Sequence, residues 1–404
     1  MKSRGRIVIV AADVRLPGEA RGLDREAYIA DLLARSGFDV ELVTSSFQHW
    51  DKAQRDTSAP MYQQVPYRIT FLHTSNYTKN ITPKRIFNHA QFAHEVAQYL
   101  DERIYDLMFA KMPPNDQCRV CAEYARTRGI PLIVDVNDLW PEAMRMVMDV
   151  PGVSSLAFSP FRRDADYAYR HATAVIGTSD DYAQRALMSG GTPELLTVYV
   201  GNDVAAFDQE ASSSAVEKPA DEFWVTYAGT IGTSYDLETL VRASRLLKDA
   251  GVASDLRLMI LGEGPEREKL MRLADALEVN ATFPGYLPHA DMVPYLIESD
   301  VLVNSFVRKA PQSIVSKVGD YLAAGKPMIN TLATPEFCRK VESDGFGLNV
   351  EPENPIELAA AILELEENPA ARKAMGKAAR RIAEEQFDRP RAYQRIVELV
   401  RSLL

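Results

Sequence analysis

The stretch from residue 301 to residue 331 reads VLVNSFVRKAPQSIVSKVGDYLAAGKPMINT and contains two short apolar runs separated by an amphipathic segment. The runs at 301–304 and 328–331 have the length and composition of buried strands. Between them, apolar residues recur every three or four positions from Pro311 up to the stop at Gly325–Pro327, which predicts a helix. A strand, a helix and a second strand in succession indicate a βαβ unit with two parallel strands.

The same alternation extends over most of the 404 residues. In the first half it predicts strands at 7–11, 39–44, 67–72, 107–110, 132–135, 174–178 and 196–199. In the second half it predicts strands at 224–228, 257–261, 281–284, 301–304, 328–331 and 347–350. Residues 203–223 are polar, rich in serine and without a strand pattern, which favours a linker.

We therefore predict an α/β protein of two Rossmann-like, doubly wound parallel-sheet domains, at residues 1–205 and 206–404. The last predicted helix has one apolar face and can pack on either domain, including by crossing back to the first. In such sheets ligands bind beyond the carboxyl ends of the strands, so we expect a central cleft between two facing domains.

Composition excludes some classes of function. Acidic residues outnumber basic ones by 56 to 46, and the net charge of −10 argues against a nucleic-acid partner. Three cysteines form no disulfide framework, which suits a reducing cytoplasm, and we interpret the Cys118 and Cys121 pair as packed thiols of a helix. No apolar stretch approaches the roughly 20 residues that span a bilayer, and the first apolar run is too short for a signal peptide. We expect a cytoplasmic protein, soluble or attached to the inner face of the membrane.

The helix predicted after residue 311 offers a site for a phosphate. Amide groups of Ile314 and Val315 at its start would face an anion, and Lys317 would add a positive charge if it lies near the first turn. Spacing alone fits a packing helix with a solvated lysine equally well.

A second candidate is the glycine loop that follows the strand at 224–228. Gly229 and Gly232 would let the backbone approach a diphosphate closely, although an ordinary turn explains them about as well. The turns at Gly262–Gly264 and at 283–287 follow strands of the same sheet. They would edge a nucleobase pocket, or serve only as turns.

Taken in order, the segments AGTIG (228–232), LMILGEGPEREKL (258–270), FPGYLPHADMVPYLIESDVLV (283–303) and SIVSKVGDYLAAGKPMI (313–329) resemble the C-terminal domain of the retaining glycosyltransferases of family four. The segment IVDVNDLWPEA (133–143) is similar to the bacterial branch that builds polysaccharides and lipid-linked glycans. The resemblance implies a GT-B fold and covers residues 224–350, with a weaker match in the first half.

The resemblance also implies roles for residues of the second domain. Asp320 stands where the family has a glutamate that binds the donor ribose, and Gln312 stands where it has another glutamate near the donor sugar. Amides at Ser313 and Ile314 would meet the sugar or diphosphate. The diphosphate loop corresponds to Gly229, Thr230 and Gly232, but the basic residue that commonly follows it is missing, and Lys317 is our candidate to replace that charge. Main-chain groups of Tyr286 and Leu287 would flank the base.

In the first domain, the resemblance extends to the loop after the first strand. Gly18, Arg21 and Gly22 fit the family's glycine-rich loop on the acceptor side, and Arg15 or Arg25 would join them. Asp138 falls where the family places a polar residue facing the reacting sugar. A simple helix cap before Trp140 is the alternative for this aspartate.

The resemblance thus predicts a retaining, metal-independent hexosyltransferase without a cofactor. It would move a hexosyl or N-acetylhexosaminyl group from a nucleoside-diphosphate sugar, with UDP or GDP, to a glycan or lipid-linked acceptor. Residues 77–92 mix basic and aromatic side chains, which suits peripheral contact with an anionic membrane or an ordinary amphipathic helix. Alternatives to transfer are a sugar-nucleotide epimerase of GT-B fold and a non-catalytic sugar-binding protein, which would carry an export signal.

Overall fold

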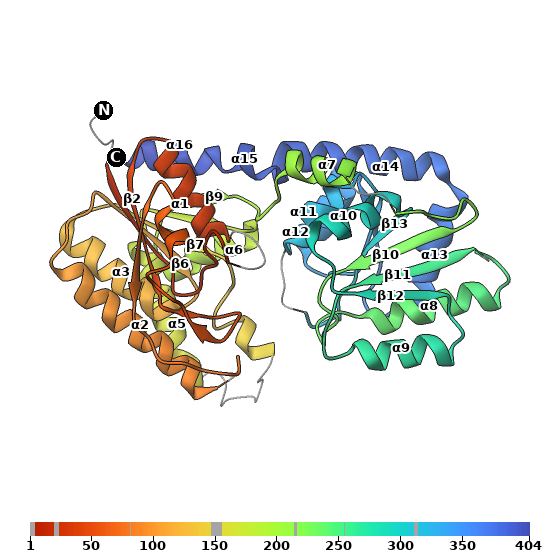
Figure 1. Ribbon diagram of the computed structural model, residues 1–404, viewed down its shortest axis with the longest axis horizontal. Coiled ribbons are helices and arrows are strands. Elements are labelled where there is room, and N and C mark those ends of the chain that lie inside the picture. Colours follow the sequence, from red (N-terminus) through yellow and green to blue (C-terminus); the bar gives the residue numbers. More distant parts are fainter. Residues whose placement is uncertain are drawn as a thin grey trace. The chain divides into compact units, whose positions relative to one another are not determined.

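The computed structural model describes residues 5–19, 24–80, 82–146, 156–213, 216–253, 255–310 and 314–404. The chain divides into two compact units (Figure 1). The first unit consists of Met1–Val198 and Tyr393–Leu404, and the second of Tyr199–Ala392. Each unit is built on one parallel sheet flanked by helices, which confirms the predicted fold class.

The sheet of the first unit has the strand order β5-β2-β1-β6-β7-β8-β9. Its strands are β1 (Arg6–Val10), β2 (Asp39–Ser45), β5 (Arg68–Leu72), β6 (Leu107–Met112), β7 (Leu132–Val136), β8 (Ala174–Gly177) and β9 (Glu194–Thr197). All seven predicted strands are present, although the last begins two residues earlier than expected. A hairpin of β3 (Phe47–Gln48) and β4 (Ala53–Gln54) was not predicted, since strands of two residues leave no periodic pattern.

Helices cover both faces of this sheet. They are α1 (Arg25–Arg35), α2 (Pro83–Asp101), α3 (Asn115–Arg128), α5 (Ser159–His171), α6 (Asp180–Gln184) and α16 (Gln394–Leu403), with short 3-10 turns η1 (Pro60–Gln63), η2 (Ala143–Met146) and η3 (Arg185–Ser189). Helices α2, α3 and α5 pack together on one core, in which Cys118 and Cys121 are fully buried free thiols, as predicted. The C-terminal helix α16 lies against α1.

A buried ion pair joins the parts of the first unit. Arg25 opens α1, and its guanidinium binds the carboxylate of Asp135 on β7 through Nε–Oδ2 and Nη2–Oδ1 contacts of 2.8 and 3.0 Å. Its Nη1 donates to the Val198 carbonyl and the Tyr393 hydroxyl, each at 2.9 Å. Burial works against the charge of Arg25, but Asp135 and Tyr393 outweigh it and raise the pKa of the guanidinium. The Arg25 side chain therefore connects α1 and β7 with the two chain ends at which the unit is divided, Val198 and Tyr393.

The second unit contains a sheet of order β12-β11-β10-β13-β14-β15. Its strands are β10 (Phe223–Ala228), β11 (Leu256–Leu261), β12 (Ala281–Gly285), β13 (Val301–Asn304), β14 (Met328–Asn330) and β15 (Gly347–Asn349), each close to its predicted position. Its helices are α7 (Val204–Ser213), α8 (Leu237–Asp249), α9 (Arg267–Ala276), α10 (His289–Glu298), α11 (Lys317–Ala323), α12 (Pro335–Asp344), α13 (Pro355–Glu367), α14 (Pro369–Ile382), the π-turn η4 (Ala383–Phe387) and α15 (Arg389–Ala392).

Two details of the second unit differ from expectation. The polar stretch that we interpreted as a linker begins with α7, because Val204 and Phe207 are buried in the core of this unit. The helix expected to start at Pro311 begins only at Lys317.

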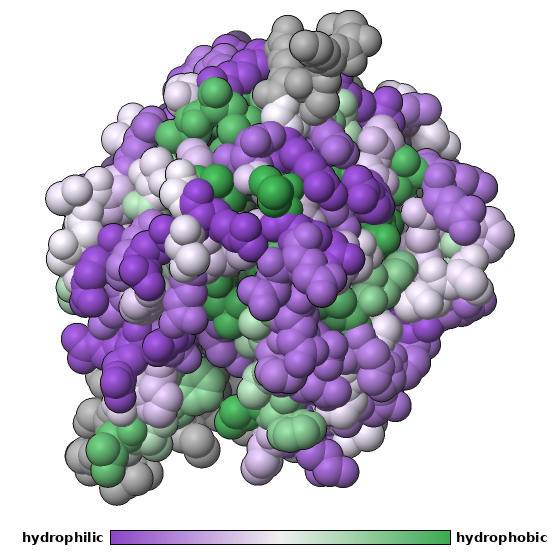
Figure 2. Space-filling view, turned by 90° about the vertical axis from the view of Figure 1, so that its left-hand side faces the viewer, coloured by the Kyte–Doolittle hydropathy of each residue, from purple (hydrophilic) through white to green (hydrophobic). Residues whose placement is uncertain are grey.

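One face of the first unit is mostly polar. Figure 2 shows one face of the first unit, on which hydrophilic side chains dominate and apolar ones form small separate patches. Within the residues that the structure describes, no helix is both long and apolar enough to cross a membrane.

Replacing Arg25 with methionine should lower the free energy of unfolding by about 3–5 kcal/mol, because it leaves the Asp135 charge buried without its cationic partner, although the hydrogen bond from Asn137 Nδ2 remains. The matched control is Arg35→Met on the same helix, which removes only an exposed pair with Asp31 and should leave the free energy of unfolding almost unchanged. Urea unfolding followed by circular dichroism measures both. Equal effects would show that the buried pair does not hold this unit together.

Candidate functional site

The glycine loop after β10 is held by the neighbouring loop after β11. The amides of Gly229 and Ile231 donate to the carbonyls of Leu261 and Glu263, both at 2.9 Å. These two amides are therefore not free for a diphosphate, which corrects part of our expectation.

Gly262 and Gly264 have a packing role. A Cβ at Gly262 would lie 1.8 Å from the Gly229 carbonyl oxygen, and one at Gly264 would lie 2.2 Å from the Ile231 oxygen. These glycines let two backbones touch, so their presence does not by itself indicate a base pocket. Thr230 and Gly232 remain at the tip of the loop, where the Thr230 carbonyl accepts a 2.7 Å hydrogen bond from the Tyr227 hydroxyl.

Lys317 lies directly beside this loop. A Cβ on Gly229 would be 3.7 Å from Lys317 Cδ, so the two predicted elements of the diphosphate site meet. The ammonium nitrogen is buried and has no hydrogen-bond partner among the described residues. It lies 4.2 Å from the ring centre of Tyr227 and 4.6 Å from that of Tyr235, with Phe306 and Tyr321 within 6 Å.

This environment has an electrostatic consequence. Aromatic faces attract a cation but provide no counter-charge, and burial lowers the pKa of Lys317 well below its usual value. The solvated lysine that we kept as an alternative is therefore wrong. An anion placed next to this nitrogen would favour its protonated form.

Asp320 lies on α11, one turn beyond Lys317. Its Oδ1 accepts a 2.9 Å hydrogen bond from Asn202 Nδ2 and lies 3.2 Å from His289 Nε2. The other ring nitrogen of His289 contacts the Glu210 carboxylate. Hydrogen bonds and charge from Asp320 and Glu210 outweigh desolvation and raise the pKa of His289 to about 9. One carboxylate oxygen of Asp320 is thus held by two partners, which orients the other oxygen.

The remaining predicted residues of this unit are placed as follows. Ile314 is buried and precedes α11, so its amide does not belong to the first turn as we expected. Tyr286 is exposed just after β12, and Leu287 packs partly against the core. Gln312 and Ser313 lie outside the described residues.

In the first unit, Asp138 follows β7 and is largely buried. Its Oδ1 accepts from the Leu139 amide at 2.9 Å, and its Oδ2 accepts from Trp140 Nε1 at 3.1 Å. Burial raises the pKa of Asp138 above its usual value, although these hydrogen bonds oppose the shift. The carboxylate caps the start of the next turn and also fixes the Trp140 ring.

The glycine-rich loop after β1 differs from its predicted role. A Cβ at Gly18 would lie 2.8 Å from Met61 Sδ, so this glycine allows close packing of the loop on η1. Arg25 does not join a phosphate loop, because it is committed to Asp135, while Arg15 stacks on Trp50 at 4.2 Å. Arg21 and Gly22 lie outside the described residues.

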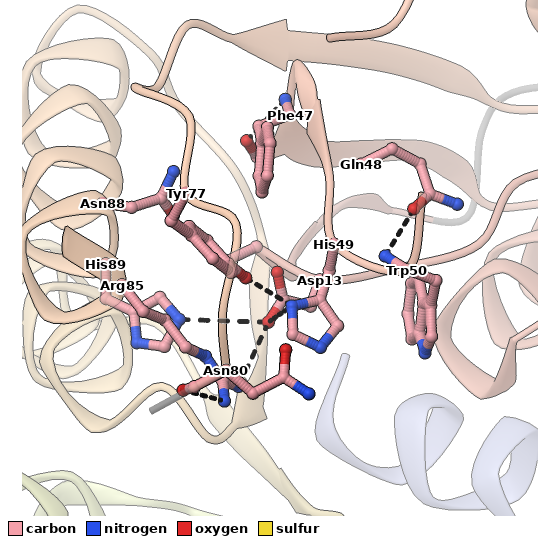
Figure 3. Close-up of polar contacts among 12 residues, drawn as sticks. Asp13, Phe47, Gln48, His49, Trp50, Tyr77, Asn80, Arg85, Asn88 and His89 are labelled. Atoms are coloured by element: carbon pink, nitrogen blue, oxygen red, sulfur yellow. Dashed lines mark hydrogen bonds and ion pairs between the residues drawn. The ribbon is translucent and has the colours of Figure 1, made fainter. Parts of the chain in front are cut away.

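Sequence reasoning missed a group of polar side chains around Asp13. His49, Tyr77, Arg85 and His89 gather there from separate segments of the first unit (Figure 3). No regular spacing links these positions, so only their placement after neighbouring strands β1, β2 and β5 would have indicated that they meet.

Comparison with known proteins decides the family. Residues 25–202 match the model of the glycosyl transferase 4-like domain, and residues 208–382 match that of the glycosyl transferases group 1. The two matches follow one another and together span well over half of the chain. This chain belongs to the glycosyltransferases.

Two curated relatives are named as glycosyltransferases of colanic acid and lipopolysaccharide core biosynthesis. This glycosyltransferase is 29% identical over 194 residues to the putative colanic acid biosynthesis glycosyltransferase WcaL of Escherichia coli, covering 46% of this chain and 45% of WcaL. It is also 29% identical over 161 residues to the lipopolysaccharide core biosynthesis glycosyltransferase LpsD of Rhizobium meliloti, covering 39% and 43%. The chain spans less than half the length of these relatives.

Solved structures share the fold of this glycosyltransferase. Sucrose-phosphate synthase of Thermosynechococcus elongatus superposes with a TM-score of 0.70 at 19% identity, covering 99% of both chains. HepE of Anabaena, solved in complex with UDP, superposes with a TM-score of 0.68 at 17% identity, covering 98% of this chain and 100% of HepE. These likenesses confirm the GT-B fold.

The raised pKa of His289 predicts a pH dependence of stability. A histidine whose pKa is raised by folding stabilises the fold fully below its unfolded value of about 6.5, and this contribution is lost as the pH rises through about 9. The difference in urea midpoint between the wild type and His289→Gln should therefore shrink from pH 6 to pH 9.5. His94→Gln is the control, because His94 is exposed and its ring is hydrogen-bonded to the uncharged side chain of Gln98. A difference that is constant across this range would contradict the charged interaction.

Proposed function

We propose that this protein is a retaining glycosyltransferase that moves a hexosyl or N-acetylhexosaminyl group from a nucleoside-diphosphate sugar to a glycan or lipid-linked acceptor. The proposed setting is the synthesis of cell-surface polysaccharide or glycoconjugate, as in the named relatives. The single observation that carries the proposal is the buried Lys317 ammonium beside the Gly229 loop, one turn from Asp320.

The proposed reaction breaks the bond between an anomeric carbon and a phosphate oxygen. Its transition state places negative charge on the departing diphosphate, and a preorganised cation in a low-dielectric site stabilises that charge more than water does. Lys317 fits this task because its nitrogen has no internal acceptor within the described residues and sits among aromatic rings. We propose that the diphosphate supplies the missing acceptor and that the charge of Lys317 makes a metal ion unnecessary.

Asp320 is proposed to bind the ribose of the donor. Asn202 and His289 hold one of its carboxylate oxygens, so the second oxygen is available in a fixed direction for a ribose hydroxyl. The base would be uracil or guanine: the neighbour HepE was solved with UDP, and a Corynebacterium glutamicum relative is named as GDP-mannose-dependent.

Asp138 is proposed to face the reacting sugar from the first unit. Trp140 and the Leu139 amide orient its carboxylate. A carboxylate held in this way would accept a hydrogen bond from a sugar hydroxyl.

The test of the donor assignment is Lys317→Ala. It should reduce kcat by about 10²–10³-fold while leaving the protein folded, because it removes charge from the leaving group. Release of nucleoside diphosphate from the donor, in buffer containing EDTA, measures the rate. Lys326→Ala is the control, since this lysine lies just past the other end of α11 and should leave the rate unchanged. Wild-type turnover in Lys317→Ala would remove this residue from the mechanism.

Peripheral contact with the inner membrane is a second element of the proposal. The first turns of α2 expose Ile86 and Phe87, with exposed fractions of 51% and 64%, next to the exposed Lys84. Apolar side chains beside a lysine suit the surface of an anionic bilayer.

Cosedimentation with vesicles containing phosphatidylglycerol measures this contact. Phe87→Ser should reduce the bound fraction severalfold, because it removes the largest exposed apolar side chain of the turn. Ile104→Ser is the matched control: Ile104 is 69% exposed but follows the opposite end of α2. An equal loss in both variants, or none in either, would contradict docking through the first turn.

A further inference from the structure

The loops at one edge of the first sheet form a polar site around Asp13. Asp13 follows β1, His49 follows β2 and the short strand β3, and Tyr77 follows β5, while Arg85 and His89 occupy the first two turns of α2. Strands β1, β2 and β5 are neighbours in the sheet, so their carboxyl ends bring these residues together. Figure 3 shows the Asp13 carboxylate between His49 on one side and Arg85 and His89 on the other.

The distances in this site are unusual for a buried carboxylate. Oδ2 of Asp13 lies 3.8 Å from His49 Nδ1, 3.8 Å from Arg85 Nη2 and 3.9 Å from His89 Nε2. All three exceed the roughly 3.2 Å limit of a direct hydrogen bond. They are short enough for one hydroxyl oxygen to bridge the carboxylate and a donor. The side chain of Asp13 is only 15% exposed, so its charge is poorly hydrated.

Neither histidine can neutralise this carboxylate near pH 7. Burial, helped by the nearby Arg85 charge, lowers the pKa of both His49 and His89 to about 4, although Asp13 opposes the shift. Burial also raises the pKa of the Tyr77 hydroxyl, which therefore stays protonated, and this hydroxyl is hydrogen-bonded to His49 Nδ1. The same ring nitrogen lies 3.8 Å from Asp13 Oδ2, which is too far for a direct hydrogen bond.

His89 differs from His49 in having a nitrogen without a partner. Its side chain is 4% exposed, and its Nε2 has no hydrogen-bond partner within the described part of the chain. The Nε of Arg85 is likewise buried and unpartnered there. Buried polar atoms of this kind are costly unless a ligand satisfies them. His89 Nε2 points towards Asp13, as Figure 3 shows.

Trp140 connects this site to Asp138. The Arg85 guanidinium lies over the Trp140 ring at 5.1 Å, and the His89 ring lies 5.8 Å from it. The same indole donates its N–H to Asp138. The Asp13 site therefore adjoins the residue proposed to face the reacting sugar, and it has an aromatic ring of the kind that stacks on a sugar face.

We propose that Asp13, His89 and Arg85 bind adjacent hydroxyl groups of an uncharged sugar of the acceptor, next to Trp140. One hydroxyl donates to the Asp13 carboxylate, and a neighbouring oxygen pairs with His89 Nε2 or the Arg85 guanidinium. Arg85 and the nearby Lys52 would attract an anion, but the Asp13 carboxylate can only accept hydrogen bonds and needs a donor opposite it. A sugar hydroxyl supplies that donor whereas an ionised phosphate or uronate oxygen does not, which favours a neutral hexose at the end of the acceptor glycan. This inference rests on the proposed transferase function and specifies the chemical class of its acceptor.

Saturation-transfer NMR with methyl glycosides of glucose, galactose and mannose tests the inference on the full chain. At least one glycoside should bind the wild type, and Asp13→Asn should weaken it at least about tenfold, because a hydrogen bond to a charged group is lost. The control is Asp51→Asn, since Asp51 is an exposed carboxylate two residues after His49. Its substitution should leave the affinity unchanged. His89→Gln provides a second variant in case Asp13→Asn does not fold, with the same expected direction.

Two further readings on the same samples separate the possible failures. Thermal stabilisation by UDP or GDP should be equal in the wild type and Asp13→Asn, because the donor residues belong to the other unit. Two results would overturn the acceptor site and leave the proposed function standing. The first is thermal stabilisation of the protein by UDP or GDP without binding of any methyl glycoside. The second is equal glycoside binding by the wild type and Asp13→Asn. Competition of inorganic phosphate against a bound glycoside would overturn the neutral class. Loss of every nucleotide effect would reject the proposed function itself.

Discussion

Parallel strands place all their carboxyl ends at one edge of a sheet, and both units depend on this constraint. Each strand must return through a helix, so the loops that leave the strands collect at that edge and the packing helices stay away from it. In the second unit the edge brings Gly229, Lys317 and Asp320 together. In the first it gathers Asp13 and Asp138 with residues from three other segments.

The charges of the molecule fall into two groups. Arg25 and Asp135 are buried in direct contact and hold the first unit together through several hydrogen bonds. Lys317 and Asp13 are also withdrawn from water, but within the part of the chain that the structure describes they lack a direct opposite charge at hydrogen-bond distance. In the first arrangement each charge is paired with the other, and the pair stabilises the fold. In the second arrangement a ligand would have to supply the missing partner, which is why we assign these residues to donor and acceptor binding.

Much of the fold could be predicted from the sequence, because apolar runs of four to six residues alternate regularly with amphipathic segments. Some predictions were wrong because a few buried residues decided the local structure against the composition of the segment. Val204 and Phe207 are buried, so a stretch that is polar overall forms α7. Strands of two residues such as β3 were missed because they leave no periodic pattern. The glycines at 262 and 264 have the composition of a ligand loop, yet their close contacts are with the backbone of Gly229 and Ile231.

The site was predictable only where its residues are close in sequence. Lys317 and Asp320 occupy one helix at a spacing of three, and the structure places Lys317 beside the glycine loop. The Asp13 group was missed because its members come from positions 13, 49, 77, 85 and 89, which only strand order brings together. His289 was missed for the same reason, since it lies on α10 and reaches Asp320 on α11.

The most direct test of the account is whether the second unit binds a nucleoside diphosphate through Asp320. Melting temperatures of the wild type and Asp320→Ala would be compared with UDP, GDP, ADP, CMP and NAD, because a ligand that binds only the folded state raises the melting temperature. The account predicts that UDP or GDP stabilises the wild type and that the variant loses this effect. Stabilisation by NAD alone, or by none of the five, would contradict it.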